Sequence, residues 1–514
     1  MLTALILSLL PCAQLDAIGD TLHAATDKST YENGAYQAAK ELAEIRSPEA
    51  MELRLDLFDD KMDTYRGVYL RDWFFSGFLK ASTAEEANLM ADAAAEKKRS
   101  EWQRVVLLRA LGRCSATVSG KLMLDKSFDK APMAVHREWA TTLGILLHEK
   151  RLDLSKVKLG KMESAEAVVR ARLAAPKGRP WPGLAYVAEL TDAEIDMLSS
   201  LVRVAKKADQ SGDCAIALRT LAGHREAWAG FTSAATFVFA RKFNSPKAVY
   251  IDAAVKNKVV SAVPALIKAL ETEGLRHPNR FSGDLGAALR SLTGQGFGDN
   301  AKTWNQWYSA EGAAWLQKAL EGEPSAKASK RVERDTVARF FGLAIDSANV
   351  VFLVDGSGSM STNKMGALSC AEAAAKEVEG FIDGLPKGVM FQVVVVEQEP
   401  VFAFKKMVPA SKGNAAKALK FLNSRPFKST SALYDALDQV QQDPMVDTIV
   451  VISDGGSSAG KHQYNGHILD GASRLFERSG VRIHTVLVTD STRHEKFMKD
   501  LASLTGGKMT APTD

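Results

Sequence analysis

A carboxylate and two hydroxyl groups stand at alternate positions directly after an apolar run. The run is Val350–Val354, and the polar residues that follow it are Asp355, Ser357 and Ser359. Consecutive β-branched or large apolar residues predict a strand buried on both faces, and ligands commonly bind at the carboxyl end of such a strand. Carboxylate and hydroxyl oxygens are hard ligands, which suit Mg²⁺, Mn²⁺ or Ca²⁺ better than zinc or copper. The segment therefore predicts a divalent-cation site at the edge of a parallel sheet.

Glycines occupy the two positions between these polar residues. Because glycine has no Cβ, we expect Gly356 and Gly358 to let the backbone turn tightly. Such a turn would aim the carboxylate and both hydroxyls at one point.

The same segment resembles the first loop of the metal-ion-dependent adhesion site in von Willebrand factor A domains. That family completes its site with a Thr from a second loop and an Asp from a third. Residues 429–437 resemble the family's G-G-T-x-L-Y-D-A-L segment, and alignment on the Leu-Tyr-Asp triplet puts Ser431 at the hydroxyl position, with Thr430 one residue away. A second apolar run, residues 449–452, leads through a serine into Asp454-Gly455, so that Asp454 fits the third-loop carboxylate.

The resemblance implies a metal site made of Asp355, Ser357, Ser359, Ser431 (or Thr430) and Asp454. Mg²⁺ is the expected ion, with Mn²⁺ and Ca²⁺ as alternatives. In the family, hydroxyls contact the metal and the aspartates act largely through water, so the cation keeps most of its charge and attracts an anion. We therefore expect metal-dependent binding of a partner protein whose Asp or Glu completes the coordination. Ser431 departs from the family's usual Thr, which leaves open how well the site holds its metal.

Other function classes find less support in the residues. No G-x-S-x-G surrounds Ser357 or Ser359, and no G-x-x-x-x-G-K-[ST] occurs, so we do not expect an enzyme. A metal-assisted hydrolase would need a base near an open metal position. His462 and His467 follow Asp454 in a loop rich in glycine and serine, where they either bind zinc or form a solvated rim. The main alternative is a helical-repeat scaffold in which the A domain is structural.

Composition describes an ordinary globular chain with more than one domain. The 514 residues are 46% apolar and 25% charged, with a formal net charge of +5. Lys and Arg are spread out rather than gathered in a stripe with aromatic residues, so we expect no nucleic-acid partner. No run after the amino terminus is long enough to be a transmembrane segment.

The amino terminus predicts export. Residues 1–17 contain the apolar core of a secretory signal, although no Lys or Arg precedes it. We expect a periplasmic, cell-surface or extracellular protein, with a cytoplasmic location as the alternative. In an oxidising compartment Cys114 and Cys214 could pair, while Cys370 is expected to be a small core residue.

The rest of the chain predicts two kinds of fold. Residues 18–320 show apolar residues at helical spacing, and part of them, about 230–310, resembles HEAT repeats. Residues 321–338 are polar and predict a linker. Residues 339–514 alternate strands with helices, which predicts a doubly wound, Rossmann-like α/β fold for the A domain. Within it we expect a short strand over 340–345 and a helix over 364–385.

Overall fold

The structure is a computed structural model that describes residues 14–24, 34–58, 67–174, 182–274, 280–322, 338–489 and 492–512. The chain forms two compact units, residues 1–190 and 191–514. The residues of the predicted signal core, 1–13, lie outside the described residues, and so does most of the predicted linker, 323–337.

The first unit is almost entirely helical, as the sequence predicts. Thr83 caps one of its helices by accepting from the Glu86 N–H at 3.2 Å, while the Glu86 carboxylate accepts from the Thr83 N–H at 3.0 Å. A parallel pair of two-residue strands, β1 and β2, links two loops. The elements are α2 (Ala35–Glu44), α3 (Pro48–Leu57), α4 (Gly67–Leu79), α5 (Ala84–Ala95), α6 (Glu101–Arg113), β1 (Val118–Ser119), α7 (Gly120–Met123), α8 (Met133–His148), β2 (Leu152–Asp153) and α9 (Ala165–Ala174).

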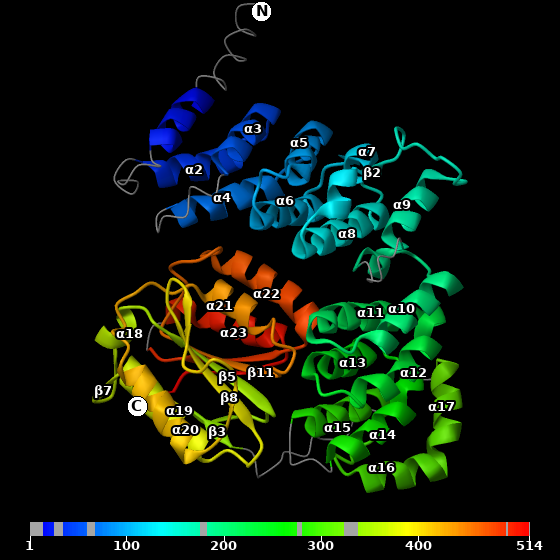
Figure 1. Cartoon of the computed structure of the whole chain (residues 1–514), viewed down its shortest axis with the longest axis vertical. Coiled ribbons are helices and arrows are strands. Elements are labelled where there is room, and N and C mark those ends of the chain that lie inside the picture. Colours follow the sequence, from blue (N-terminus) through cyan, green and yellow to red (C-terminus); the bar gives the residue numbers. More distant parts are fainter. Residues whose placement is uncertain are drawn as a thin grey trace, which may run out of the picture. The chain divides into compact units, whose positions relative to one another are not determined.

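The second unit begins with a further series of helices (Figure 1). Asn300 caps one of them by accepting from the Thr303 N–H at 3.1 Å. The aromatic residues that follow close the core, since Trp304 and Trp307 are buried and their rings lie 5.8 Å apart. The elements are α10 (Asp192–Val204), α11 (Ser211–Gly223), α12 (Trp228–Phe239), α13 (Asn244–Lys256), α14 (Val263–Gly274), α15 (Arg280–Thr293), α16 (Ala301–Trp307), a π-helical turn (Tyr308–Gly312) and α17 (Ala313–Leu320).

The α/β part of this unit is built on a seven-stranded sheet in the order β10-β8-β5-β11-β12-β13, with β9 also paired to β8. Strands β8, β5, β11, β12 and β13 are parallel, while β9 and β10 run antiparallel to β8. This mixed, mostly parallel sheet confirms the predicted α/β class. The strands are β5 (Asn349–Asp355), β8 (Met390–Val396), β9 (Pro400–Phe402), β10 (Val408–Pro409), β11 (Thr448–Ser453), β12 (Arg482–Leu487) and β13 (Met509–Thr510).

Helices cover both faces of this sheet (Figure 1). In β5, Phe352 and Val354 pack with α19 and α20, while Val351 and Leu353 pack with α21, α22 and α23. Both faces of the strand are buried, which explains why its sequence is a continuous apolar run. The helices are α18 (Ser359–Thr362), α19 (Cys370–Asp383), α20 (Lys412–Asn423), α21 (Leu433–Val440), α22 (Asn465–Ser479) and α23 (Glu495–Leu504).

Two predicted elements of the α/β part are corrected by the structure. The helix expected over 364–385 begins only at Cys370, because residues 364–369 form a small hairpin of β6 (Lys364–Met365) and β7 (Leu368–Ser369). The strand expected over 340–345 is a second hairpin, β3 (Arg339–Phe340) with β4 (Leu343–Ala344). Phe341 and Gly342 turn this hairpin with φ values of 44° and 78°. Neither hairpin belongs to the seven-stranded sheet.

The helices of the second unit hold the α/β part at the amino ends of its strands. Arg280 of α15 donates to the carbonyl of Asp447, just before β11, and at 2.9 Å to that of Gly480, just before β12. Gly480 has φ of 60°, and a Cβ there would lie 2.7 Å from Ala248 of α13. Arg219 of α11 donates at 2.7 Å to the carbonyl of Glu477, near the end of α22. The opposite edge of the sheet, where the strands end, therefore carries none of these contacts.

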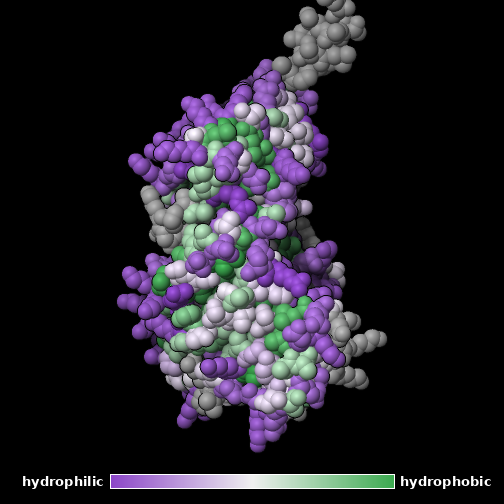
Figure 2. Space-filling view, turned by 90° about the vertical axis from the view of Figure 1, so that its right-hand side faces the viewer, coloured by the Kyte–Doolittle hydropathy of each residue, from purple (hydrophilic) through white to green (hydrophobic). Residues whose placement is uncertain are grey.

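The surface is mixed in character. Figure 2 shows hydrophilic residues over much of one face, with smaller hydrophobic patches between them. Among the described residues, no helix combines the length and apolar character needed to cross a membrane. The side chains of Cys114, Cys214 and Cys370 are buried, and Cys370 lies in the core of the α/β part as predicted.

Candidate metal centre

The predicted first and third loops leave the sheet side by side. Asp355 is the last residue of β5, and Ser453, the last residue of β11, immediately precedes Asp454. The register pairs Val354 with Ile452 in these parallel neighbours. Parallel strands end at the same edge, so the topology alone brings the two carboxylates together.

The two glycines of the first loop are not equivalent. A Cβ at Gly356 would lie 2.8 Å from Cγ of Glu397 and 3.0 Å from the carbonyl oxygen of Val396. Gly358 has a helical φ of −62°, and a Cβ there would meet its nearest neighbours only at 4.0 Å. The expectation that both glycines are needed is therefore wrong for Gly358, and the close approach of β8 explains Gly356.

Asp355 is a buried carboxylate held at both oxygens. Oδ1 accepts the Ser357 N–H at 2.9 Å, and Oδ2 accepts the Ser453 hydroxyl at 2.5 Å. Burial raises the pKa of Asp355, while these two hydrogen bonds oppose the shift and the charge of Asp454 adds to it. The side chain is thus fixed in direction before any ligand arrives.

The two serine hydroxyls and Asp454 form a chain of short contacts. The Oγ atoms of Ser357 and Ser359 lie 3.0 Å apart, and the Ser359 hydroxyl donates to Oδ1 of Asp454 at 3.0 Å. Oδ2 of Asp454 accepts the side-chain amide of Asn363 at 2.8 Å. Sequence reasoning missed Asn363 and Ser453, which orient the two carboxylates. Ser453 could have been found, since it stands directly before Asp454 at the end of a strand.

The second loop lies against the other two through its main chain. Ser429 forms a parallel bridge with Ser357 and donates its N–H to the Gly356 carbonyl at 3.3 Å. The carbonyl of Ser431 accepts from the Ser457 hydroxyl at 2.7 Å and from the Ser458 N–H at 2.8 Å, both in the third loop. All three loops are therefore joined by hydrogen bonds.

Ser431 suits the hydroxyl position better than Thr430. Ser431 is 3% exposed and lines a small cavity together with Asp355, Ser453 and Ser457. Thr430 is half-buried and does not line that cavity. Within the described part of the chain, the Ser431 hydroxyl makes no hydrogen bond of its own. Its oxygen is therefore not committed to another group.

A family comparison agrees with the topology and the three loops. Residues 348–510 match the family model described as von Willebrand factor type A domain. These residues are a von Willebrand factor A domain. No curated protein matches the chain.

Matches among solved structures come from several organisms. The match to a von Willebrand factor type A protein from Catenulispora acidiphila has 18% identity and a TM-score of 0.27, and covers 33% of this chain and 40% of that one. The match to the manganese-loaded TRAP protein of Plasmodium vivax has 17% identity and a TM-score of 0.25, and covers 30% of this chain and 62% of that one. The match to the Ro (RSR) protein of Deinococcus radiodurans has 13% identity and a TM-score of 0.20, and covers 91% of this chain and 93% of that one. The chain thus spans less than half of the Catenulispora protein.

The histidines after the third loop of the A domain lie among aromatic rings. His462 is 4.8 Å from the ring of Tyr434 and 5.9 Å from that of His467, and His467 is 5.2 Å from Tyr464. These edge-on arrangements are typical of packed rings. Both imidazoles are buried, so the prediction that they form a solvated rim is wrong.

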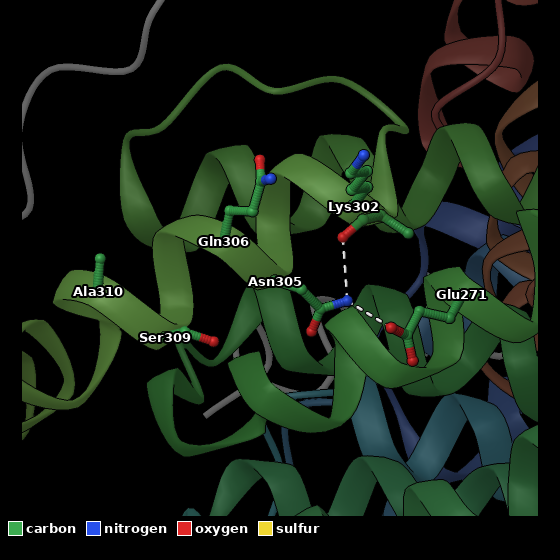
Figure 3. Close-up of a pocket in the computed structure, with 7 residues that line it drawn as sticks. Glu271, Lys302, Asn305, Gln306, Ser309 and Ala310 are labelled. Carbon is green, nitrogen blue, oxygen red and sulfur yellow. Dashed lines mark hydrogen bonds between the residues drawn. The ribbon is translucent and has the colours of Figure 1, made fainter.

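A separate hollow lies in the helical part, outside the A domain. It is open, with a volume of about 1040 Å³, between α14 and the stretch from α16 into the π-helical turn. Figure 3 shows the side-chain amide of Asn305 reaching the carboxylate of Glu271 and a main-chain carbonyl, that of Ala301. Lys302, Gln306 and Ser309 line the same hollow. Its size makes it the clearest feature for a binding role of the helices.

Proposed function

We propose that the A domain binds a partner protein through a divalent cation. Asp355, Ser357, Ser359, Ser431 and Asp454 would hold the ion, and an Asp or Glu of the partner would complete its coordination. The observation that carries the proposal is the convergence of these oxygens at one sheet edge, with Ser357, Ser359 and Asp454 linked at 3.0 Å. Mg²⁺ is the ion we expect, because all the donors are hard oxygens.

The hydrogen bonds that orient the proposed ligands support the binding of such an ion. The Asp355 carboxylate is already fixed by Ser453 and by the Ser357 N–H. Asn363 fixes Asp454 in the same way. Preorganised ligands of this kind raise affinity, since little order is lost on binding. When bound, the cation would supply a positive charge for a carboxylate of the partner.

Protein binding explains the site better than catalysis. An enzyme would need a nucleophile activated by a nearby base, or a base beside the metal. The hydroxyls of Ser357 and Ser359 contact each other and Asp454, whose second oxygen is held by Asn363. These contacts suit ligation of a cation, and we propose no reaction for the chain.

Metal titration by calorimetry on the full chain tests the proposal. Wild type should bind one Mg²⁺ or Mn²⁺, and Ser359→Ala should weaken binding at least tenfold, because one direct ligand is lost from an exposed position. Asp383→Ala, an exposed acid at the end of α19, is the matched control and should bind as wild type does. Equal titrations for all three proteins would exclude the site.

A variant pair separates the two second-loop hydroxyls. Ser431→Ala should reduce metal affinity, whereas Thr430→Ala should not, because only Ser431 lines the cavity beside Asp355. The reverse result would move the ligand to Thr430 and leave the rest of the site in place.

The second candidate function is a helical scaffold with a structural A domain. The open hollow lined by Glu271, Lys302 and Asn305 favours it. A partner captured from an extract of the source cells decides between the two. Capture that survives EDTA and Asp355→Ala, but fails with Lys302→Glu, would place binding on the helices instead.

A further inference from the structure

A groove of about 540 Å³ opens on the A domain beside the proposed metal centre. One wall is α19 with the hairpin before it, and the other is the end of α20 with the segment that follows. Ser361 of α18 belongs to the lining, only two residues after the ligand Ser359. Two residues of extended chain span at most about 7 Å. A peptide bound at the metal would therefore reach this groove with its neighbouring residue.

Phe427, a residue with a strained backbone, connects the groove to the first metal loop. Phe427 has φ of 45°, which is unfavourable for a bulky side chain, and its ring is buried in the core. Its carbonyl accepts the Ser361 hydroxyl at 3.2 Å, and the same hydroxyl donates to the Gly358 carbonyl at 2.8 Å. These bonds fix the groove against the first metal loop, so the two surfaces are continuous.

The lining offers an apolar surface in reach of a ligand. Leu368, on the hairpin, is 36% exposed, and Leu419 on α20 is half-buried. Side chains of this kind gain free energy when another apolar group covers them. A leucine or phenylalanine of a bound chain would cover both.

The charges beside this apolar surface are unequal. Glu372, Lys376 and Glu379 lie along one face of α19, at the spacing of successive helical turns. Arg425 is already engaged, because its Nε and Nη2 both donate to Oε1 of Glu397, at 3.0 and 2.5 Å. Glu372 caps α19 by accepting from the N–H and the hydroxyl of Ser369 at 2.7 and 2.8 Å, and these neutral donors leave its negative charge in place. Besides the Arg425–Glu397 pair, the lining therefore carries two carboxylates, Glu372 and Glu379, against the one ammonium of Lys376, which favours a basic residue in the ligand.

We propose that this groove selects the partner, by binding a large apolar residue next to the metal-completing acid and a basic residue beyond it. The inference rests on the proposed metal-dependent function and adds to it the kind of segment that is recognised. The occupant is an extended segment of a partner protein.

Synthetic peptides on the full chain with Mg²⁺ test the groove. The probes are acetyl-Gly-Asp-Leu-Lys-Gly-amide and the reversed Gly-Lys-Leu-Asp-Gly, each compared with versions carrying Ser for Leu or Asn for Asp. For one of these two sequence orders, the peptide with Leu should bind roughly tenfold more tightly than its counterpart with Ser, because the groove buries an apolar side chain. Methyl signals of Leu368 and Leu419 should shift with the Leu peptide.

A variant pair assigns the preference to the groove. Leu368→Ser should bring the Leu and Ser peptides to equal affinity, and its exposed position keeps the fold intact. Phe237→Ser on α12 is the matched control, since Phe237 is 37% exposed and lies in the helical part, and it should keep the preference.

The two hypotheses fail in different ways. Binding that needs Mg²⁺ and Asp, but treats Leu and Ser peptides alike, overturns the groove and leaves the metal function standing. Peptide binding that ignores EDTA and the Asn exchange overturns the metal function itself. Full metal binding with no peptide bound at millimolar concentration also overturns the groove.

Discussion

The hydroxyl of Ser453 donates a 2.5 Å hydrogen bond to Oδ2 of Asp355, and so joins the carboxyl ends of β11 and β5. The same Oγ accepts the Gly455 N–H at 3.0 Å, which fixes its direction. One serine thus sets both the orientation of a buried carboxylate and the course of the third loop. Groups that hold ligands in this way often matter nearly as much as the ligands.

Ser453→Ala should weaken Mg²⁺ binding by about 10- to 100-fold, because Asp355 loses the donor that orients it. Calorimetry on the full chain measures the change. Ser424→Ala removes an exposed hydroxyl at the end of α20 and should leave the affinity as it is. If both variants bind metal as wild type does, Asp355 is held by other contacts or does not serve the site.

Alanine substitutions at the two glycines of the first loop should have different effects on stability. Gly356→Ala should destabilise the fold by about 1–3 kcal/mol, because the Val396 carbonyl 3.0 Å away cannot move aside. Gly358→Ala should be neutral or stabilising by up to about 1 kcal/mol, because its φ of −62° suits any residue. Urea unfolding of both variants measures the difference. Similar losses for the two would contradict the geometry of this loop.

The loops that carry the proposed metal ligands could be predicted from the sequence, because each directly follows or precedes an element with a clear local pattern. Asp355 follows a continuous apolar run, and such a run reports a strand buried on both faces. The contact of Asn363 with Asp454 could not be predicted in this way, since the two residues are 91 positions apart and meet only in the folded chain. The late start of α19 was missed because Lys364–Ser369 lacks a strand-like pattern.

The polar contacts between the helices and the A domain could not be predicted from the sequence either. Asp447 accepts hydrogen bonds from Ser347 at 2.7 Å and from the Asn349 N–H at 2.8 Å, and its carbonyl accepts from Arg280. An isolated aspartate before a strand carries no sequence signal for such a role. The pattern of local elements identifies the two kinds of fold, but the polar contacts between them depend on tertiary structure.

Stability should fall in mild acid because of His484. Burial, together with the charges of Arg482 and Arg280, lowers the pKa of this imidazole from 6.5 to about 3. The neutral ring is therefore favoured in the fold, and its contribution is fully present above pH 6.5. Below that pH the unfolded chain gains a proton that the folded chain does not, so stability is lost progressively down to about pH 3, by at most about 1.4 kcal/mol per pH unit.

Comparison of His484→Gln with wild type isolates this effect. The urea midpoint of wild type should fall more steeply between pH 7 and 5 than that of the variant, whose side chain does not titrate. His148→Gln, at an exposed position on α8, is the control for loss of a histidine. Parallel midpoints for wild type and His484→Gln across this range would contradict the assignment.

Arg280 should hold the A domain to its helices without affecting metal binding. It donates to the carbonyls of Asp447 and Gly480 and pairs with Asp284 at 2.8 Å, and Asp284 also pairs with Arg482 at 2.7 Å. Removing one member of a buried ionic group leaves charge and carbonyls without a donor, so Arg280→Met should destabilise the second unit by about 3–5 kcal/mol, while the exposed Arg203→Met should not. Urea unfolding gives the stability and calorimetry the Mg²⁺ affinity. Because Arg280 acts at the amino ends of the strands and the metal loops leave the carboxyl ends, the folded variant should keep wild-type affinity; a tenfold loss would instead show that the helices regulate the metal centre.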